Sequence, residues 1–296
     1  MSGVALSLVL LAGLVHATWN LAAKRASGGV AFSAVTSLYA MVLWAPIGIP
    51  VLIHETPGWN GGQWTAVGAS AVLHVAYFAA LLRGYQVGDL SVVYPVARGT
   101  GPLLTVIAAV IFRHERPGAI GLLGVLAIVG GVVLIATGGR IVRTETLAAG
   151  LGYGLVTGAT IAAYTLLDGH SVKELGVSPI GLDYGSNLVR AGLTVPIAWI
   201  VLQRSGINAG GKVTPVAYVR EHARMAAVVG LLSPLAYVLV LQAAKTTDLS
   251  RVAPAREVSM LFAALFAGSL LKEEGVAVRM VGASFIALGV AAVALG

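Results

Sequence analysis

The chemistry of this sequence is concentrated in arginine and acidic side chains that lie within long apolar stretches. Four arginines and one well-placed acid fall in such stretches: Arg98, Arg190, Arg251, Arg256 and Glu257. A charged side chain at the centre of a membrane-spanning helix costs about 2.5–3.5 kcal/mol on insertion scales, so these groups must face protein or water. Guanidinium groups match the oxygens of carboxylates and phosphates. The excess of arginines therefore predicts a polar site for an anionic or zwitterionic small molecule.

Arg98 and Glu257 belong to two copies of one motif. The segments GDLSVVYPVARGTG, from Gly88, and TDLSRVAPAREVSM, from Thr247, each contain Asp-Leu-Ser, with a proline six residues after the aspartate. Nine residues after the aspartate stands Arg98 in the first copy and Glu257 in the second. We expect these two equivalent positions to approach each other and form an ion pair that offsets the burial of both charges. Alternatively, Arg256 takes the role of Arg98 through a local shift.

The aspartates and prolines of this motif have structural interpretations. Asp89 and Asp248 begin their expected helices, where a carboxylate caps free N–H groups, and we favour capping over direct ligand contact. Pro95 and Pro254 delete a backbone hydrogen bond and are expected to kink the helix. A kink for packing and a kink that shapes the site both stay open.

Other polar side chains recur at helical spacing and predict a cavity lined by several helices. Two stripes have the spacing 4, 3 and 4, namely Tyr94, Arg98, Gly101 and Thr105, and Asp183, Asn187, Arg190 and Thr194. Shorter stripes are Ser70, His74 and Tyr77, then Thr157, Thr160, Tyr164 and Asp168, and finally His16 with Asn20. The substrate-binding candidates are Arg98, Tyr94, Arg190, Asn187, Glu257, Arg256, Tyr77, His74, Tyr237, Tyr164, Trp19 and Asn20. The tyrosines and Trp19 either line the cavity or fill it.

Three residues are candidates for carrying a coupled proton: His16, His74 and Asp183. Histidine titrates near neutral pH, which suits this role. A buried neutral histidine that is satisfied by hydrogen bonds is the structural alternative.

The elements that position these residues are membrane-spanning helices. Of the 296 residues, 57% are hydrophobic and 10% are charged, and the mean hydropathy is +0.89. A helix needs about 20 apolar residues to cross about 30 Å of hydrocarbon. Apolar windows predict ten helices, at about 3–23, 30–53, 63–84, 89–112, 117–138, 147–168, 180–203, 224–244, 248–271 and 275–295. The protein is thus predicted to be an all-α, multi-pass integral membrane protein of the cell (plasma or inner) membrane, with its first span retained.

These ten expected helices form two related halves, residues 1–138 and 147–296. Glu115 corresponds to Glu274, and the pair Gly124 and Gly131 corresponds to Gly282 and Gly289. Five helices per half place the halves in opposite orientations, and inverted repeats with a site near the midplane are typical of transporters. The glycine pairs, and Gly150, Gly154 and Gly158, are expected to allow close helix contact.

Several function classes find no support in the sequence. There are no cysteines, which excludes thiolate metal sites, disulfides and cysteine nucleophiles. Phosphate-binding loops, zinc-protease motifs and serine nucleophile elbows are also missing, so we expect neither an enzyme, a cofactor nor a metal. The net charge of +7 lies mostly in short loops, which is typical of membrane orientation and not of nucleic-acid binding. The expected partners are a small-molecule substrate and the lipid bilayer.

Several of these features together resemble a known family. They are HATWNLAAKR at the end of the first span, the Asp- and Pro-bearing fourth and ninth spans, and the turns FRHERPG and LLKEEG. They look like the drug/metabolite transporter superfamily, EamA type. This resemblance implies a transporter with both termini in the cytoplasm. Lysine and arginine, however, are more frequent in the odd-numbered loops, and if these loops face the cytoplasm both termini lie outside. Unlike the small multidrug relatives, the first span has no acidic residue, which argues against cationic drugs as substrates.

We expect alternating access, with the two halves rocking around the central site and the fourth and ninth helices moving. A passive channel or facilitator is the alternative, and a membrane-embedded enzyme is a further one. Substrate identity, direction of transport, coupling ion, orientation and oligomeric state are left open by the sequence.

Overall fold

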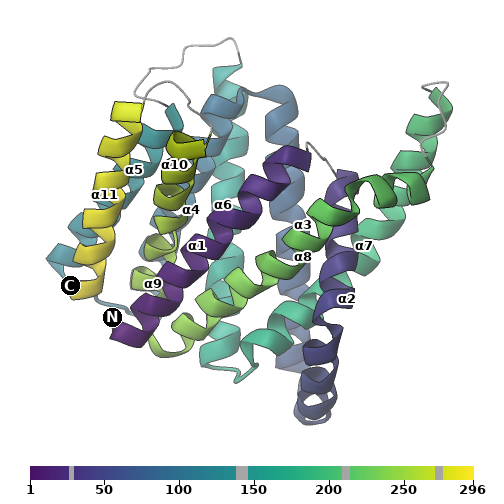
Figure 1. The fold of residues 1–296 in the computed structure, drawn as a ribbon. Coiled ribbons are helices and arrows are strands. Elements are labelled where there is room, and N and C mark those ends of the chain that lie inside the picture. Colours follow the sequence, from purple (N-terminus) through teal and green to yellow (C-terminus); the bar gives the residue numbers. More distant parts are fainter. Residues whose placement is uncertain (27–29, 138–145, 209–213, 271–275) are drawn as a thin grey trace.

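The computed structural model describes the chain outside residues 27–29, 138–145, 209–213 and 271–275 (Figure 1). Over the described residues the protein is all helical. Its helices are α1 (Gly3–Ala26), α2 (Val30–Glu55), α3 (Gly61–Val87), α4 (Leu90–Arg113), α5 (Ala119–Thr137), α6 (Leu147–Lys173), α7 (Pro179–Asn208), α8 (Pro215–Thr246), α9 (Leu249–Ala255), α10 (Val258–Leu270) and α11 (Val276–Leu295), with a 3-10 turn η1 (Thr56–Gly58). Glu274 lies outside the described residues.

Eight of the described helices, α1 to α8, are long and apolar enough to cross a membrane. They coincide with the first eight expected spans. The expected ninth span is divided into α9 and α10, and in α11 a shorter apolar segment, Met280–Leu295, is found. The predicted membrane fold is therefore present, while the count of ten spans stays a prediction.

The division of the ninth span follows Pro254. Arg256 and Glu257 stand between α9 and α10, and the Glu257 N–H bonds the Pro254 carbonyl at 3.0 Å, a tighter turn than an α-helix makes. The Met260 N–H likewise bonds the Glu257 carbonyl at 2.9 Å. In the first copy, by contrast, α4 runs through Pro95 without interruption. The expected bend is thus a helix break in the second copy only.

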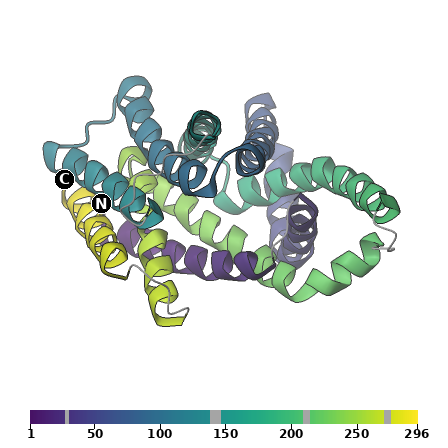
Figure 2. The same cartoon turned by 90° about the horizontal axis from the view of Figure 1, so that it is seen from above.

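Glycines bring α5 and α11 into backbone contact, as predicted. A Cβ atom at Gly124 would lie 2.7 Å from the Gly289 carbonyl oxygen, and one at Gly131 would lie 2.5 Å from the Gly282 carbonyl oxygen. Figure 2 shows the two helices together at one edge of the bundle, α11 in yellow beside α5 in teal. Gly124 thus faces Gly289, and Gly131 faces Gly282. This crossed pairing is what the predicted repeat, with Gly124 equivalent to Gly282 and Gly131 to Gly289, would produce around a twofold axis.

A second row of glycines sets the contact between α6 and α4. A Cβ atom at Gly154 would lie 2.7 Å from Val96 Cβ, and one at Gly158 would lie 3.1 Å from the Gly101 nitrogen. The prediction of close helix contact at these glycines is confirmed. It brings the face of α4 that carries Val93, Val96 and Thr100 against α6.

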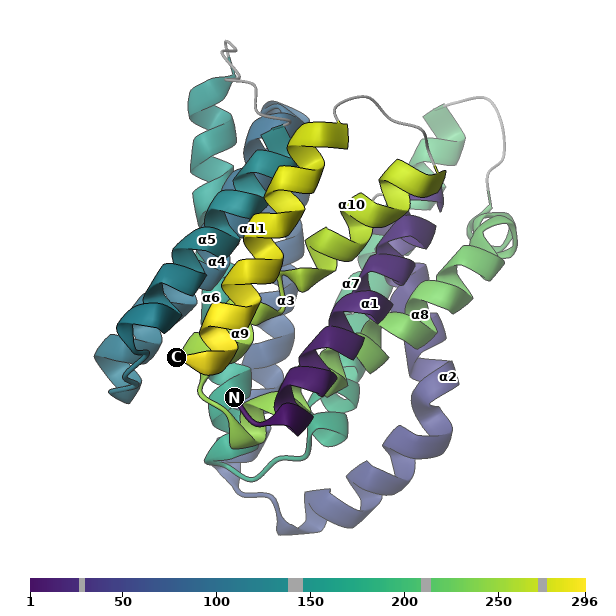
Figure 3. The same ribbon diagram turned by 60° about the vertical axis from the view of Figure 1, so that its left-hand side comes forward.

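The remaining helix pairs are also matched between the halves. α1 packs on α8 and α3 packs on α6, while α4 packs on α6 and α1 packs on α10. The predicted correspondence between α1–α5 and α6–α11 relates the first of these contacts to the second and the third to the fourth. It also relates α2 to α7, which pack on each other, while the inverted repeat itself stays a prediction. Figure 3 shows the divided pair α9 and α10 beside α1, with α5 and α11 next to them.

Candidate functional site

Arg98 and Glu257 form the predicted ion pair. Arg98 Nη2 lies 3.0 Å from Glu257 Oε2, and the Glu257 side chain is 1% exposed. Arg98 Nη2 also donates to Ser259 Oγ at 3.3 Å, and one turn earlier on α4 the Tyr94 hydroxyl contacts Met260 Sδ at 3.2 Å. The charged face of α4 is therefore joined to the break between α9 and α10, which is the part of the chain that the repeat predicts to face it.

The break in the ninth span also positions Arg256. Its side chain is buried, and its Nε lies 3.9 Å from Glu257 Oε1, beyond hydrogen-bonding distance. Arg256 lines a small cavity of about 10 Å³ between α6, α8 and α9, together with Thr165 and Tyr237. Arg98 makes the short contact with Glu257 and Arg256 makes only the longer one, so Arg256 does not take over the role of Arg98.

An aromatic cluster lies beside these arginines. His74 stacks on Tyr164 with ring centroids 4.1 Å apart, and it meets Tyr237 edge-on at 5.5 Å. Tyr77 packs edge-on against Tyr164 at 5.8 Å. His74 Nδ1 must donate to the Ser70 carbonyl, 2.8 Å away, because that oxygen only accepts. Four predicted site residues from α3, α6 and α8 thus meet in one cluster: His74, Tyr77, Tyr164 and Tyr237.

Asp168 forms the polar edge of this aromatic cluster. The Tyr237 hydroxyl donates to Asp168 Oδ2 at 2.5 Å, and Asp168 has no exposed surface. Its other oxygen, Oδ1, has no hydrogen-bond partner among the described residues. The sequence placed Asp168 at the end of a polar stripe but did not single it out as a site residue.

The stripe on α7 is buried at Asp183 and Asn187, as its spacing predicts. Arg190 Nη2 lies 3.7 Å from Asp183 Oδ1, while Arg190 Nε is buried and has no hydrogen-bond partner in the described part of the chain. Asn187 Nδ2 donates to the Ser37 carbonyl of α2 at 3.2 Å. Arg190 lies close enough to His74 and Asp168 for their charges to interact, so this stripe belongs to the same site.

Three other sequence candidates, all on α1, lie at the edge of this site or outside it. His16 meets Trp19 edge-on at 4.7 Å, and Trp19 packs against a separate apolar cluster that includes Phe32 and Val229. Asn20 is exposed and donates to the His16 carbonyl of its own helix at 2.8 Å. The structure therefore does not bring Trp19 and Asn20 into the cluster of arginines and tyrosines.

The charge count of the bundle differs from the sequence expectation. Arg251 donates to the carbonyl of Gly296 at 2.8 Å, at the end of the chain, and so leaves the central group. Asp168 and Asp183 join Glu257 as buried acids. The central group thus holds three arginines (Arg98, Arg190 and Arg256) and three acids (Glu257, Asp168 and Asp183), where the sequence suggested a clear excess of arginine. The fourth buried acid, Glu115, lies outside this group, beside Arg113.

Asp89 and Asp248 occupy the N-cap positions of α4 and α9, but the capping prediction is wrong in its chemistry. Neither carboxylate bonds a helix N–H. Asp89 accepts from Thr146 at 2.9 Å, and Asp248 pairs with Lys173 at 3.3 Å. The two carboxylates instead contact a hydroxyl group just before α6 and an ammonium group on α6. They therefore link the starts of α4 and α9 to α6 and do not cap their own helices.

Glu115 provides the cap that Asp248 does not. Its Oε1 accepts from the Leu249 N–H at 3.2 Å and its Oε2 from the Ser250 N–H at 2.8 Å. The sequence identified Glu115 only as the counterpart of Glu274. A cap supplied by a distant turn leaves no local signature, which is why sequence reasoning missed it.

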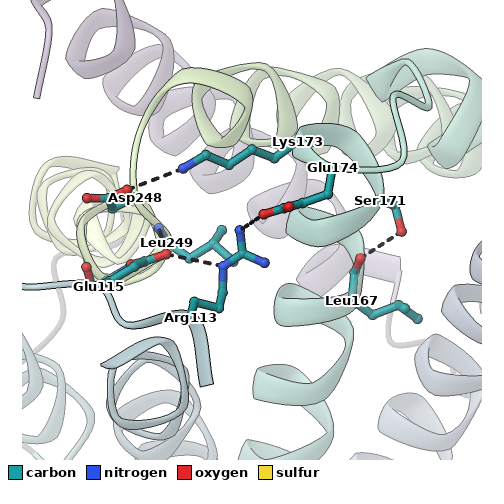
Figure 4. Close-up of polar contacts among 9 residues, drawn as sticks. Arg113, Glu115, Leu167, Ser171, Lys173, Glu174, Asp248 and Leu249 are labelled. Atoms are coloured by element: carbon teal, nitrogen blue, oxygen red, sulfur yellow. Dashed lines mark hydrogen bonds and ion pairs between the residues drawn. The ribbon is translucent and has the colours of Figure 1, made fainter. Parts of the chain in front are cut away.

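This cap is part of a polar network at one end of the bundle. Arg113 lies 3.4 Å from Glu115 Oε1 and 2.8 Å from Glu174 Oε1, and Lys173 pairs with Asp248 nearby (Figure 4). The α4–α5 turn, the end of α6 and the start of α9 are thereby held together. Both chain termini lie at this end, where the Met1 amino group donates to the Ala294 carbonyl at 2.7 Å.

No cluster of three or more histidine and acidic side chains suited to a metal ion occurs in the described part of the chain. What this interior offers a ligand is guanidinium, phenol and imidazole groups, which suit the oxygens of a small polar anion.

Comparison with known proteins decides the family. Residues 3–137 match the EamA-like transporter family. This match covers 135 of the 296 residues, all of them in the first half of the chain. The resemblance to the drug/metabolite transporter superfamily is thus confirmed, and with its apolar helices the protein is a multi-pass membrane transporter.

Solved structures show how far the fold of this transporter is shared. One, described as "Crystal structure of protein", aligns over 98% of each chain with a TM-score of 0.73 and 16% sequence identity. At that identity the match establishes the common fold and carries no information about substrate. Comparison with curated proteins gives no match for the EamA-like chain.

Proposed function

We propose that this transporter moves a small anionic or zwitterionic metabolite, such as an amino acid, an organic acid or a phosphonate, across the cell membrane. The observation that supports it best is a group of three arginines, one buried and two mostly buried, with unused hydrogen-bond donors. Arg98 Nε and Arg190 Nε are buried without a partner, and Arg256 has no acceptor within hydrogen-bonding distance among the described residues.

Buried donors without acceptors are destabilising unless something binds them. Each unsatisfied polar group costs about 1–3 kcal/mol, and more when it is charged. A carboxylate or phosphonate placed beside Arg256 would accept from it and would gain the attraction of the positive groups nearby. Tyr164 and Tyr237 lie within electrostatic reach of Arg256 and supply the apolar faces and hydroxyl groups that position the rest of a small molecule.

Alternating access around this site is supported by two features of the structure. The ninth span is interrupted where Arg256 and Glu257 stand, and transporter sites are commonly built from such discontinuous helices. The Glu115 network, formed by Arg113, Glu115, Lys173, Glu174 and Asp248, fastens one end of the bundle. In our proposal this end is the closed gate, and two inverted halves of five spans rock to open it.

Ligand-induced thermal stabilisation of the purified protein tests the substrate class. A panel of amino acids, organic acids, phosphonates and organic cations would be compared, and a bound ligand at 100 times its Kd adds about 2.7 kcal/mol of stability. We expect stabilisation by at least one anion or zwitterion, which Arg256→Gln abolishes. Arg251→Gln is the matched control, because Arg251 bonds the chain terminus. Stabilisation by cations alone, or equal stabilisation of both variants, would contradict the proposal.

The two alternatives have distinct signatures in proteoliposomes. A channel would conduct the same solute without saturation, and an enzyme would release it covalently changed. Saturable uptake of an unchanged solute supports the transporter mechanism.

A further inference from the structure

We propose that Asp168 binds the proton that couples transport to a pH gradient, with Oδ1 as the protonated atom. The inference rests on the proposed function, because it names the coupling ion of the same anion site. It assigns the role to a residue other than the sequence candidates His16, His74 and Asp183.

The contacts of Asp168 divide its two oxygens by role. Oδ2 accepts the Tyr237 hydroxyl hydrogen at 2.5 Å, and Oδ1 has no hydrogen-bond partner among the described residues. A carboxylic acid has one acceptor oxygen and one O–H group. In a protonated Asp168, Oδ2 would be the oxygen that accepts from Tyr237, and Oδ1 would carry the proton.

Asp168 differs from the other buried acids in lacking a cation. Glu257 pairs with Arg98 at 3.0 Å, Asp183 with Arg190 at 3.7 Å, and Glu115 with Arg113 at 3.4 Å. Among the described residues, no lysine, arginine or histidine nitrogen lies within 4 Å of an Asp168 oxygen. A fully buried carboxylate without a paired cation is costly, and acidic groups of this kind inside membrane proteins mark proton pathways.

The neighbours of Asp168 from every helix packed against α6 set its surroundings. α8 brings Tyr237, α3 brings Ser70 and His74, and α7 brings Asp183 and Arg190. Farther from Asp168, Tyr164 on α6 itself lies within electrostatic reach of Arg98 on α4 and of Arg256 after α9. The positive groups oppose a metal cation at this position, whereas a proton adds no ion that needs further ligands.

Proton binding at Asp168 would change the charge balance of the site. The central group of Arg98, Arg190, Arg256, Glu257, Asp183 and Asp168 holds three arginines and three acids. An ionised Asp168 makes its charge sum zero, and a protonated Asp168 makes it +1. One anionic substrate restores the balance. The proton and the anion therefore assist each other's binding, by a factor we expect to be about tenfold, within the range typical of coupled sites.

A water-sized cavity lies beside the turn of α6 that carries Asp168. Thr165 and Gly169, on either side of Asp168 along α6, line it with Tyr237 and Leu249. Leu249 covers Gly169, since a Cβ atom there would lie 2.5 Å from Leu249 Cδ1. Glu115 caps the helix that begins with Leu249, so opening the Glu115 network would uncover this side of the cavity.

Infrared difference spectra between acid and alkaline pH test the proton site without any substrate. The full-length protein in lipid vesicles should show a carboxylic-acid C=O band that Asp168→Asn removes and Asp183→Asn retains. Tyr237→Phe deletes the hydrogen bond to Oδ2 and should move the band to higher wavenumber, which keeps the test informative if Asp168→Asn does not fold. Loss of the band in Asp183→Asn, or its persistence in Asp168→Asn, would overturn the proposal.

Transport in the same vesicles separates this proposal from the proposed function. If the anion panel gives saturable uptake, an inward acid gradient should drive accumulation in the wild-type protein. In Asp168→Asn this gradient-driven accumulation should be lost, while exchange between labelled and unlabelled pools continues. Equal accumulation in both proteins overturns the proton role and leaves anion transport standing. If no anion is transported, the proposed function fails, and the infrared result still decides whether Asp168 binds a proton.

Discussion

Replacing Glu257 by glutamine should destabilise the protein strongly, because it leaves Arg98 buried without a counter-charge. Arg98 Nη2 and Glu257 Oε2 are 3.0 Å apart, and the two side chains are 14% and 1% exposed. At an effective dielectric constant of about 20, the attraction at this distance is about 5 kcal/mol. Part of it is balanced by desolvation, and breaking a buried pair by removing one partner costs about 3–5 kcal/mol. We expect Glu257→Gln to fall in that range.

The double-mutant cycle isolates the pair from other effects of the substitution. Arg98→Gln/Glu257→Gln removes both charges, so we expect it to be less destabilised than the two single variants predict together, by at least about 2 kcal/mol. The assay is reversible unfolding of the purified protein in mixed micelles, followed by circular dichroism.

The control cycle uses a second arginine–glutamate pair, Arg113 and Glu174, whose carboxylate side is 51% exposed. Its coupling energy should stay below about 1 kcal/mol, as is usual for exposed pairs. If the Arg98 and Glu257 substitutions are additive within about 0.5 kcal/mol, the ion pair does not hold α4 to the break in the ninth span, and our description of the site is wrong.

Three further substitutions test the packing around the site. Gly131→Val should destabilise the protein by about 3 kcal/mol in the same unfolding assay, because the added Cβ atom meets the Gly282 carbonyl. Gly130→Val, which has open space around it, should be near neutral. Equal effects of the two substitutions would refute the α5–α11 contact. Gly154→Val on α6 should likewise be far more damaging than Gly152→Val, and a harmless Gly154→Val would refute the contact with Val96. Glu115→Ala leaves the Leu249 and Ser250 N–H groups uncapped and should cost about 2–4 kcal/mol. The partly exposed Glu174→Ala should cost less than about 1 kcal/mol, and a similar loss in both variants would argue against the cap.

The repeat in the sequence predicted the contact between Arg98 and Glu257 correctly because the two residues occupy the same position in the two copies of the motif. Arg98 and Glu257 stand at equivalent places in two copies of one motif, and in the predicted inverted repeat such places would meet near the axis between the halves. Helical spacing similarly predicted the buried face of α7 at Asp183 and Asn187. These inferences needed only periodicity and the cost of charge in lipid.

Features that depend on a distant partner could not be read from the sequence. A local pattern places Asp248 at a helix start, but the competing donor Lys173 and the competing cap Glu115 come from other helices. Arg251 and Arg256 look alike in one apolar stretch, and only the fold directs Arg251 to the chain terminus. Asp168 fits a polar stripe, yet the missing hydrogen-bond partner of its Oδ1 among the described residues is a property of its three-dimensional surroundings.

Uptake of labelled anions into proteoliposomes tests most directly whether the buried arginine cluster is a substrate site. We predict saturable uptake of at least one small carboxylate, phosphonate or amino acid by the wild-type protein and by Arg251→Gln, with loss of at least about tenfold in Arg256→Gln. Full uptake by correctly folded Arg256→Gln, or saturable uptake of cations in place of anions, would contradict our account of the site.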